Sequence, residues 1–159
     1  MHAILRDQYA LVQSARGALL DYCATLAPAD FVVPLPAFND GNIRDLLVHT
    51  ANTYRHWLGV VARQHPRTYF DVAAVPDVAA VRACFALVDQ LMLDFLAHAA
   101  GREQQAELLA VPGRPAPLPL TPLQLFTHVI THEFHHKGQV LSMSRQLGYV
   151  PVDTDVIRT

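Results

Sequence analysis

The sequence predicts an all-α protein, a four-helix bundle with irregular connections and a C-terminal tail. Apolar residues recur at three- and four-residue spacings along four long stretches, which is typical of the buried face of a helix, and no convincing β alternation occurs. Of the 159 residues, 52% are hydrophobic and 16% charged, so the chain should fold around a sizeable core. We expect a single domain over residues 1–159.

The first predicted helix occupies the N-terminal segment and ends near Ala27-Pro28, where a Pro-rich, irregular connection follows. Its core stripe consists of Leu5, Tyr9, Val12, Ala15, Leu19, Tyr22 and Cys23. The second helix should start between Asn39 and Asn42, because these side chains are good N-caps. Its core stripe consists of Ile43, Leu47, Thr50, Tyr54 and Val61.

The third predicted helix starts at about Asp77. Its core stripe consists of Val81, Phe85, Val88, Met92 and Phe95. Residues 101–120 are too rich in proline and glycine for a continuous helix, and the motif VPGRPAP indicates a turn or a small hairpin.

The fourth predicted helix has the clearest start in the chain. Thr121 is a good N-cap, Pro122 occupies the first helical position, and Gln124 completes a capping box. Gly148 is a good helix stop. The remaining residues are predicted to be an irregular tail.

Composition limits the functional classes. The net charge is −2 without long runs of either sign, which argues against nucleic-acid binding. Polar residues interrupt the apolar N-terminal segment, so neither a secretory signal nor a membrane span is expected. We therefore expect a soluble, cytoplasmic protein without membrane partners. Cys23 and Cys84 form no metal or redox spacing and are predicted to be reduced, buried thiols.

Histidine is the unusual feature of this chain. His132 and His136 lie four residues apart in the fourth helix, so both imidazoles leave one face a turn apart and can grip one ion. With Glu133 they form an H-E-x-x-H motif, the zinc signature of many metalloproteases. The pair can also be ordinary core or surface histidines. His128 extends the run, but three positions along one helix are too spread to share one ion.

A third ligand from another helix is geometrically better. The second helix offers His49 at the edge of its apolar arc, and His56 rotated further towards solvent. His49 is therefore the better candidate, and His56 is expected at a rim. Trp57 is a candidate for lining a ligand pocket, although helical spacing also suits a core residue. Gln139, one turn beyond His136, is a candidate for hydrogen bonding to a ligand imidazole.

Three segments resemble one known family. They are IRDLLVHTANTYRHWL in the second helix, HEFHHKGQVLSMSRQLGYVP in the fourth, and VDTD in the tail. Their order and spacing are similar to those of the DinB-like (DinB/YfiT) metal-binding four-helix-bundle proteins. The resemblance implies that His49, His132 and His136 bind a divalent metal. One departure is Lys137, which stands where the family usually has arginine, so a bidentate contact there is in doubt.

The resemblance implies a function as well. It suggests a metal-dependent, thiol-dependent S-transferase or isomerase that uses a bacillithiol- or mycothiol-like thiol and a small-molecule substrate. One alternative is a non-catalytic metal-binding or stress-related protein with a structural metal, and a weaker one is a metal-dependent hydrolase. Proteolysis is disfavoured, because the 23 residues after His136 contain no histidine or cysteine for a third ligand.

Cofactors and assembly follow from the same resemblance. Zinc or nickel is the expected metal, with iron as a further option, since three histidines suit several divalent ions. The only candidate for a catalytic side chain is Glu133, which could orient water or a ligand but is more often ion-paired in such a position. The family suggests a homodimer.

Overall fold

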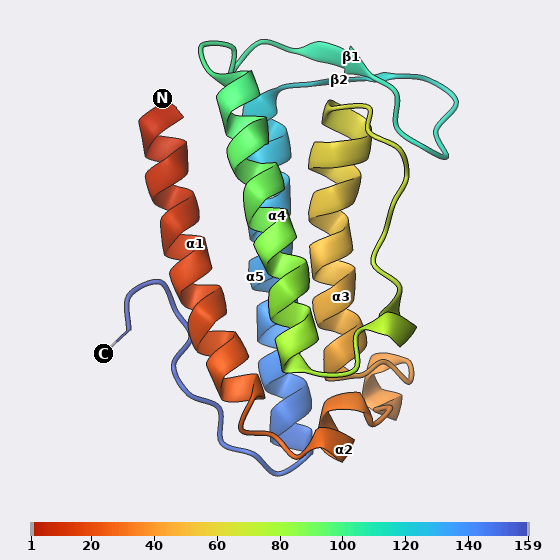
Figure 1. Ribbon diagram of the computed structural model, residues 1–159, viewed down its shortest axis with the longest axis vertical. Helices are drawn as coiled ribbons and strands as arrows, with labels where there is room; N and C mark the ends of the chain where they lie inside the picture. The colour runs from red at the N-terminus through yellow and green to blue at the C-terminus, as the bar shows by residue number, and fades with distance from the viewer. Residues whose placement is uncertain (1, 159) are drawn as a thin grey trace.

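The computed structural model describes residues 2–158. Four long helical elements lie side by side (Figure 1). They are α1 (His2–Cys23), α3 (Ile43–Tyr54) with its continuation η2 (Arg55–Ala62), α4 (Val78–Ala99) and α5 (Pro122–Gln146). The predicted all-α, four-helix architecture is confirmed.

The helices do not simply alternate in direction. In Figure 1, α1 and α5 run one way, while α3 and α4 run the other way. The parallel pair α3 and α4 therefore needs a long crossover, which residues 63–77 supply together with the short 3₁₀ turn η3 (Val72–Ala74). α4 packs between α1 and α3, and α5 packs against α3 and α1. The crossover follows the outer side of α3, where it can shape a site on that helix.

The predicted helix starts are confirmed by capping hydrogen bonds. The Asn42 side chain accepts a bond from the backbone N–H of Asp45 at the start of α3. Asp77 does the same for Ala80 at the start of α4. At α5, Thr121 caps the helix and both bonds of the predicted capping box are present. Each cap satisfies backbone donors that the first helical turn leaves unpaired.

Two expectations about the first 62 residues need correction. α1 ends at Cys23, and Pro28 begins the short helix α2 (Pro28–Val32) because proline is tolerated in a first helical turn. The 3₁₀ turn η1 (Pro36–Phe38) follows, so the connection is more ordered than predicted. The second predicted helix also changes character after Tyr54, where η2 is a π-helix. Its wider turns alter the rotation of every later side chain, and such segments occur often at functional sites.

A small hairpin closes one end of the bundle, as the turn motif predicted. β1 (Glu107–Leu109) pairs antiparallel with β2 (Leu118–Leu120), with Glu107 opposite Leu120 and Leu109 opposite Leu118. Within residues 2–158 no helix is both long and apolar enough to cross a membrane.

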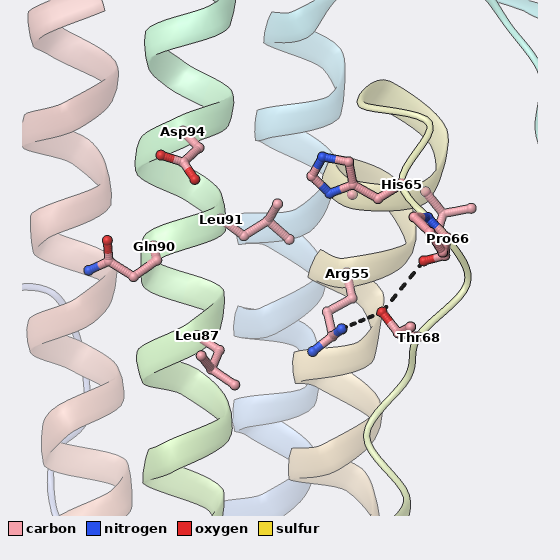
Figure 2. Close-up of a pocket in the computed structure, with 10 residues that line it drawn as sticks. Arg55, His65, Pro66, Thr68, Leu87, Gln90, Leu91 and Asp94 are labelled. Atoms are coloured by element: carbon pink, nitrogen blue, oxygen red, sulfur yellow. Dashed lines mark hydrogen bonds between the residues drawn. The ribbon is translucent and has the colours of Figure 1, made fainter.

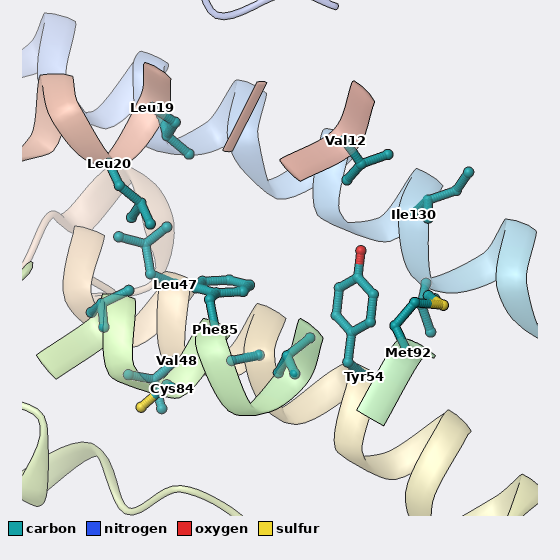
Figure 3. Packing of buried hydrophobic residues seen from close by; sticks show 14 of the residues in the cluster. Val12, Leu19, Leu20, Leu47, Val48, Tyr54, Cys84, Phe85, Met92 and Ile130 are labelled. Atoms are coloured by element: carbon teal, nitrogen blue, oxygen red, sulfur yellow. The ribbon is translucent and has the colours of Figure 1, made fainter. Parts of the chain in front are cut away.

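The core lies along the bundle axis. Figure 3 shows side chains from all four long helices in one cluster, among them Val12, Leu47, Phe85 and Ile130. The predicted stripes of α1, α3 and α4 are buried, and Cys23 and Cys84 are buried free thiols as expected. This packing fixes the rotation of each helix, and thereby decides which side chains meet at its edge.

Candidate metal centre

Three histidines from two helices meet at the edge of the bundle. α3 presents His49, and α5 presents His132 and His136 one turn apart. One ring nitrogen from each lies within 4.8 Å of those of the other two. The Nε2 atoms of His132 and His136 are 3.1 Å apart. These are the residues that the sequence singled out as metal ligands, and the structure brings them together.

The spacing of the nitrogens fits one divalent ion. Two nitrogens bound to zinc at about 2.05 Å and at the tetrahedral angle lie about 3.3 Å apart, close to the separation of the two Nε2 atoms. The ring of His49 is 5.2 Å from that of His132 and 5.0 Å from that of His136, measured between centroids. The cluster is compatible with a metal site.

A neighbouring amide orients one of the imidazoles. The Oε1 atom of Gln139 lies 2.6 Å from Nδ1 of His136, and because a carbonyl oxygen only accepts, the imidazole carries its proton on Nδ1. The lone pair of Nε2 then faces the cluster, which is the arrangement that metal-binding histidines use. Gln139 thus makes the contact for which its sequence position made it a candidate. Among residues 2–158, the buried Nδ1 of His132 has no hydrogen-bond partner.

The environment of His132 and His136 favours their neutral form. Burial, together with the neighbouring His136 and His49, lowers the pKa of His132 to about 4. Burial also lowers the pKa of His136. Neutral imidazole is the form that binds metals, so at neutral pH the pair is ready for an ion without losing a proton first.

The other histidines stay outside the cluster, as the sequence predicted for His128. That residue is exposed, its ring centroid 6.0 Å from that of His132, and it packs instead against Trp57 at 4.9 Å. His135 is exposed as well. His56 lies at a rim, with Nδ1 2.8 Å from the hydroxyl of Tyr69.

Glu133 belongs to a different environment. Its carboxylate is buried and accepts bonds from Arg16 Nε at 2.8 Å and Nη2 at 3.0 Å, and from the Tyr54 hydroxyl at 2.5 Å. Arg16 also pairs with Asp89 at 2.7 Å, and the Tyr9 hydroxyl donates to the carboxylate of Asp89. Both Glu133 oxygens are therefore occupied, and the residue is not part of the histidine group. Of the two roles considered for Glu133, that of an ion-pair partner fits these contacts better than that of a catalytic residue.

The pKa shifts show how tightly this network is closed. Burial alone would lower the pKa of Arg16, but the Glu133 carboxylate more than offsets it and the pKa lies well above its usual value. Burial, and next the Glu133 charge, raise the pKa of Tyr54. Arg16 and Tyr54 therefore keep their protons at physiological pH.

Two cavities open beside the histidines, and His49 borders both. The first, which we name the polar cavity, has a volume of about 360 Å³. It is lined by Ala37, Phe38, Asn39, Gly41, Asn42, Asp45, Leu46, His49, Gln139 and Met143. The second, which we name the aromatic cavity, has a volume of about 440 Å³. It is lined by His49, Asn52, Thr53, His56, Trp57, Tyr69 and His132.

A third cavity lies between η2 and α4 and includes none of the three histidines. Figure 2 shows Arg55, His65 and Asp94 around this space of about 420 Å³. Its most evident binding group is already engaged, since Arg55 donates to the Thr68 hydroxyl at 2.5 Å and lies 4.5 Å from the Phe70 ring centre. The two cavities that reach the histidines are the better candidates for a functional site.

Sequence reasoning missed two contributors. Tyr69 reaches the aromatic cavity from the crossover, and no periodicity marks that segment. Arg16 is one of the polar residues that interrupt the apolar N-terminal segment. It shares a helix face with Val12 and Leu20, and a charge among buried apolar residues is a signal that a partner must exist elsewhere.

Comparison with known proteins gives one family. The model described as the DinB family matches residues 1–159, the whole chain. Among curated proteins, none matches the sequence significantly.

Proposed function

This chain belongs to the DinB family, and we propose that it binds one divalent metal ion through His49, His132 and His136 and acts as a thiol-dependent S-transferase or isomerase. The observation that carries the proposal is the meeting of three ring nitrogens within 4.8 Å, one helix presenting two and a second helix presenting the third.

The donor set suits an open, reactive site. Three neutral imidazoles leave a divalent ion its full charge, and catalytic zinc sites use three protein ligands with one free position. A metal bound here would lower the pKa of a thiol at that position and favour the thiolate. The chain's own contribution is orientation, since Gln139 fixes the tautomer of His136. Zinc or nickel is the expected metal, with iron next.

Access to the cluster favours a catalytic role over a structural one. Structural zinc sites are closed by four protein ligands, whereas here two cavities border the histidines and His49 is exposed. The polar cavity offers Asn39, Asp45 and Gln139 to a hydrophilic thiol. Glu133 is assigned a structural role, because its carboxylate is already paired with Arg16.

The first experiment measures metal content per chain by elemental analysis. We expect about one equivalent of a single divalent metal in the native protein, loss in His132→Ala, and retention in the matched control His135→Ala, whose imidazole is exposed on the same helix. Chains that hold no metal even after incubation with zinc, nickel and iron would overturn the proposal.

A second experiment separates an open from a closed site. Cobalt-substituted protein is titrated with 2-mercaptoethanol, bacillithiol and mycothiol while its absorption spectrum is recorded. A new thiolate-to-cobalt band supports the transferase or isomerase. An unchanged spectrum with every thiol, in a protein that holds its cobalt, would favour a structural metal. Thiol-independent ester or amide cleavage would favour the hydrolase instead.

The homodimer stays a prediction from the family resemblance. Some apolar side chains of α1 and α4 are exposed and could contribute to such an interface, namely Ile4, Leu11, Leu87 and Leu93. Light scattering coupled to size-exclusion chromatography would give twice the chain mass of 17.6 kDa for a dimer.

A further inference from the structure

The aromatic cavity has a wall of ordered rings. The indole of Trp57 is held edge-to-face between two imidazoles, with centroids 5.1 Å from His56 and 4.9 Å from His128. The Tyr69 ring lies 6.3 Å from that of His56, and the two residues share a hydrogen bond of 2.8 Å. Edge-to-face contacts of this kind stabilise a fixed ring orientation, so the wall is in place before a ligand arrives.

The crossover is clamped so that Tyr69 keeps its place. The Asn52 side-chain amide donates to the carbonyl of Phe70 at 3.0 Å and accepts from its N–H at 2.7 Å, as a paired strand would. The Arg55 guanidinium covers the Phe70 ring at 4.5 Å. Tyr69 itself is 46% exposed, so its ring remains available to a ligand. Fixing the segment beforehand lowers the entropy that a ligand would lose on binding.

The lining carries little charge. None of its seven residues is an aspartate, glutamate, lysine or arginine. Burial, with Arg67 and His128 as further causes, lowers the pKa of His56, which favours its neutral form. The Asn52 amide is occupied by Phe70, and the Thr53 hydroxyl donates to the carbonyl of His49 at 3.1 Å. What remains for a ligand is mainly the faces and edges of aromatic rings.

The two cavities at His49 therefore differ in chemistry. The polar cavity presents the amides of Asn39 and Gln139 and the carboxylate of Asp45, which pairs with its neighbour Arg44 at 2.9 Å. The aromatic cavity presents Trp57 and other rings. Two ligands of different polarity can thus approach the histidines from different sides.

We infer that the aromatic cavity is the substrate subsite and takes an uncharged planar group, aromatic or conjugated, which packs against Trp57 and Tyr69 beside the histidine cluster. This inference rests on the proposed function, since the reacting end of the substrate would lie at the metal. The inference adds the chemical class of the substrate to the proposed function, and it leaves the polar cavity as the binding site of the thiol.

The test uses two probes that share a metal-binding group. Benzohydroxamate carries a planar ring, acetohydroxamate carries a methyl group in its place, and both are titrated into zinc-loaded protein by calorimetry. We expect benzohydroxamate to bind more tightly by about tenfold, because stacked and edge-to-face ring contacts add to the affinity. Trp57 is the single tryptophan of the chain, so its fluorescence reports ring binding independently.

Three variants locate the ring. Trp57→Leu and Tyr69→Leu should each reduce the preference for benzohydroxamate and leave the affinity for acetohydroxamate unchanged. Phe38→Leu, the matched control, removes a ring from the polar cavity and should keep the preference. Equal affinities in the native protein, or a preference that depends on Phe38 alone, would overturn the inference while the metal site stands. If neither probe binds the zinc-loaded protein, the metal has no open coordination position, and both proposals are overturned.

Discussion

Arg16 on α1 and Glu133 on α5 form a buried, two-pronged ion pair across the bundle, with N–O distances of 2.8 and 3.0 Å. The Tyr54 hydroxyl of α3 and the Asp89 carboxylate of α4 complete the network. Each long helix contributes at least one member. Glu133 follows His132 directly in α5. Its pairing with Arg16 therefore also fixes the rotation of the helix that carries His132 and His136.

Glu133→Ala should destabilise the protein strongly. Removal of one partner of a buried ion pair costs about 3–5 kcal/mol. Here the buried Arg16 keeps its bond to Asp89 but loses both bonds to Glu133, and the Tyr54 hydroxyl loses its acceptor. Urea unfolding followed by circular dichroism measures the change. The double variant Arg16→Met, Glu133→Leu should recover part of the loss, since apolar replacements remove both charges of the pair, while the buried Tyr54 hydroxyl still lacks its acceptor. A double variant as unstable as Glu133→Ala would contradict this explanation.

Metal binding should raise thermal stability. A ligand that binds only the folded state at 100 times its Kd adds about 2.7 kcal/mol, which for a chain of this size raises the Tm by about 5–10 °C. Zinc should produce this rise in the native protein and in His128→Ala, whose imidazole lies outside the cluster. His132→Ala should show no rise in differential scanning calorimetry. An equal rise in all three proteins would place the metal elsewhere.

Lys137→Met should release the C-terminal tail. The Lys137 ammonium is buried, donates to the carbonyl of Thr154 at 2.5 Å and lies 4.2 Å from the Phe134 ring centre. Methionine keeps most of the apolar stem but loses the donor, which costs about 1–3 kcal/mol for a bond from a charged group. Hydrogen exchange of residues 149–158 should accelerate while that of α5 stays slow. Unchanged exchange in the tail would show that Lys137 does not hold it.

The two thiols predict a loss of stability at alkaline pH. Burial raises the pKa of Cys23 to about 12 and also raises that of Cys84. An unfolded cysteine ionises near pH 8.5, so above that pH the unfolded chain releases protons that the folded chain retains, and the free energy of unfolding falls as pH rises. Urea midpoints between pH 8 and 10 measure the fall, which Cys23→Ala should lessen.

A thiol-labelling experiment checks the same burial directly. A disulfide reagent at pH 8 should modify neither Cys23 nor Cys84 in the native protein within minutes, and both in urea, because only the accessible thiolate reacts. Rapid native labelling of both thiols would contradict the burial of these side chains.

The sequence alone predicted the features that depend on local periodicity and capping. Asn42, Asp77 and Thr121 cap their helices, because a side chain bonds to a backbone N–H only three residues away. His132 and His136 share a face because four residues make about one helical turn, and the preference for His49 over His56 agrees with the cluster in the structure.

Tertiary structure decided what depends on the rotation of the helices and on the path of the crossover. The partner of Glu133 lies 117 residues away at Arg16, and no local pattern links them. Tyr69 reaches the aromatic cavity because long-range contacts, among them the two Asn52–Phe70 hydrogen bonds, hold the crossover against α3. Local sequence thus determined where α3, α4 and α5 begin and placed His132 and His136 on one helix face, since both follow from the geometry of near neighbours along the chain. Core packing and long-range hydrogen bonds decided the buried ion pair and the two cavities, because these require the relative placement of whole helices.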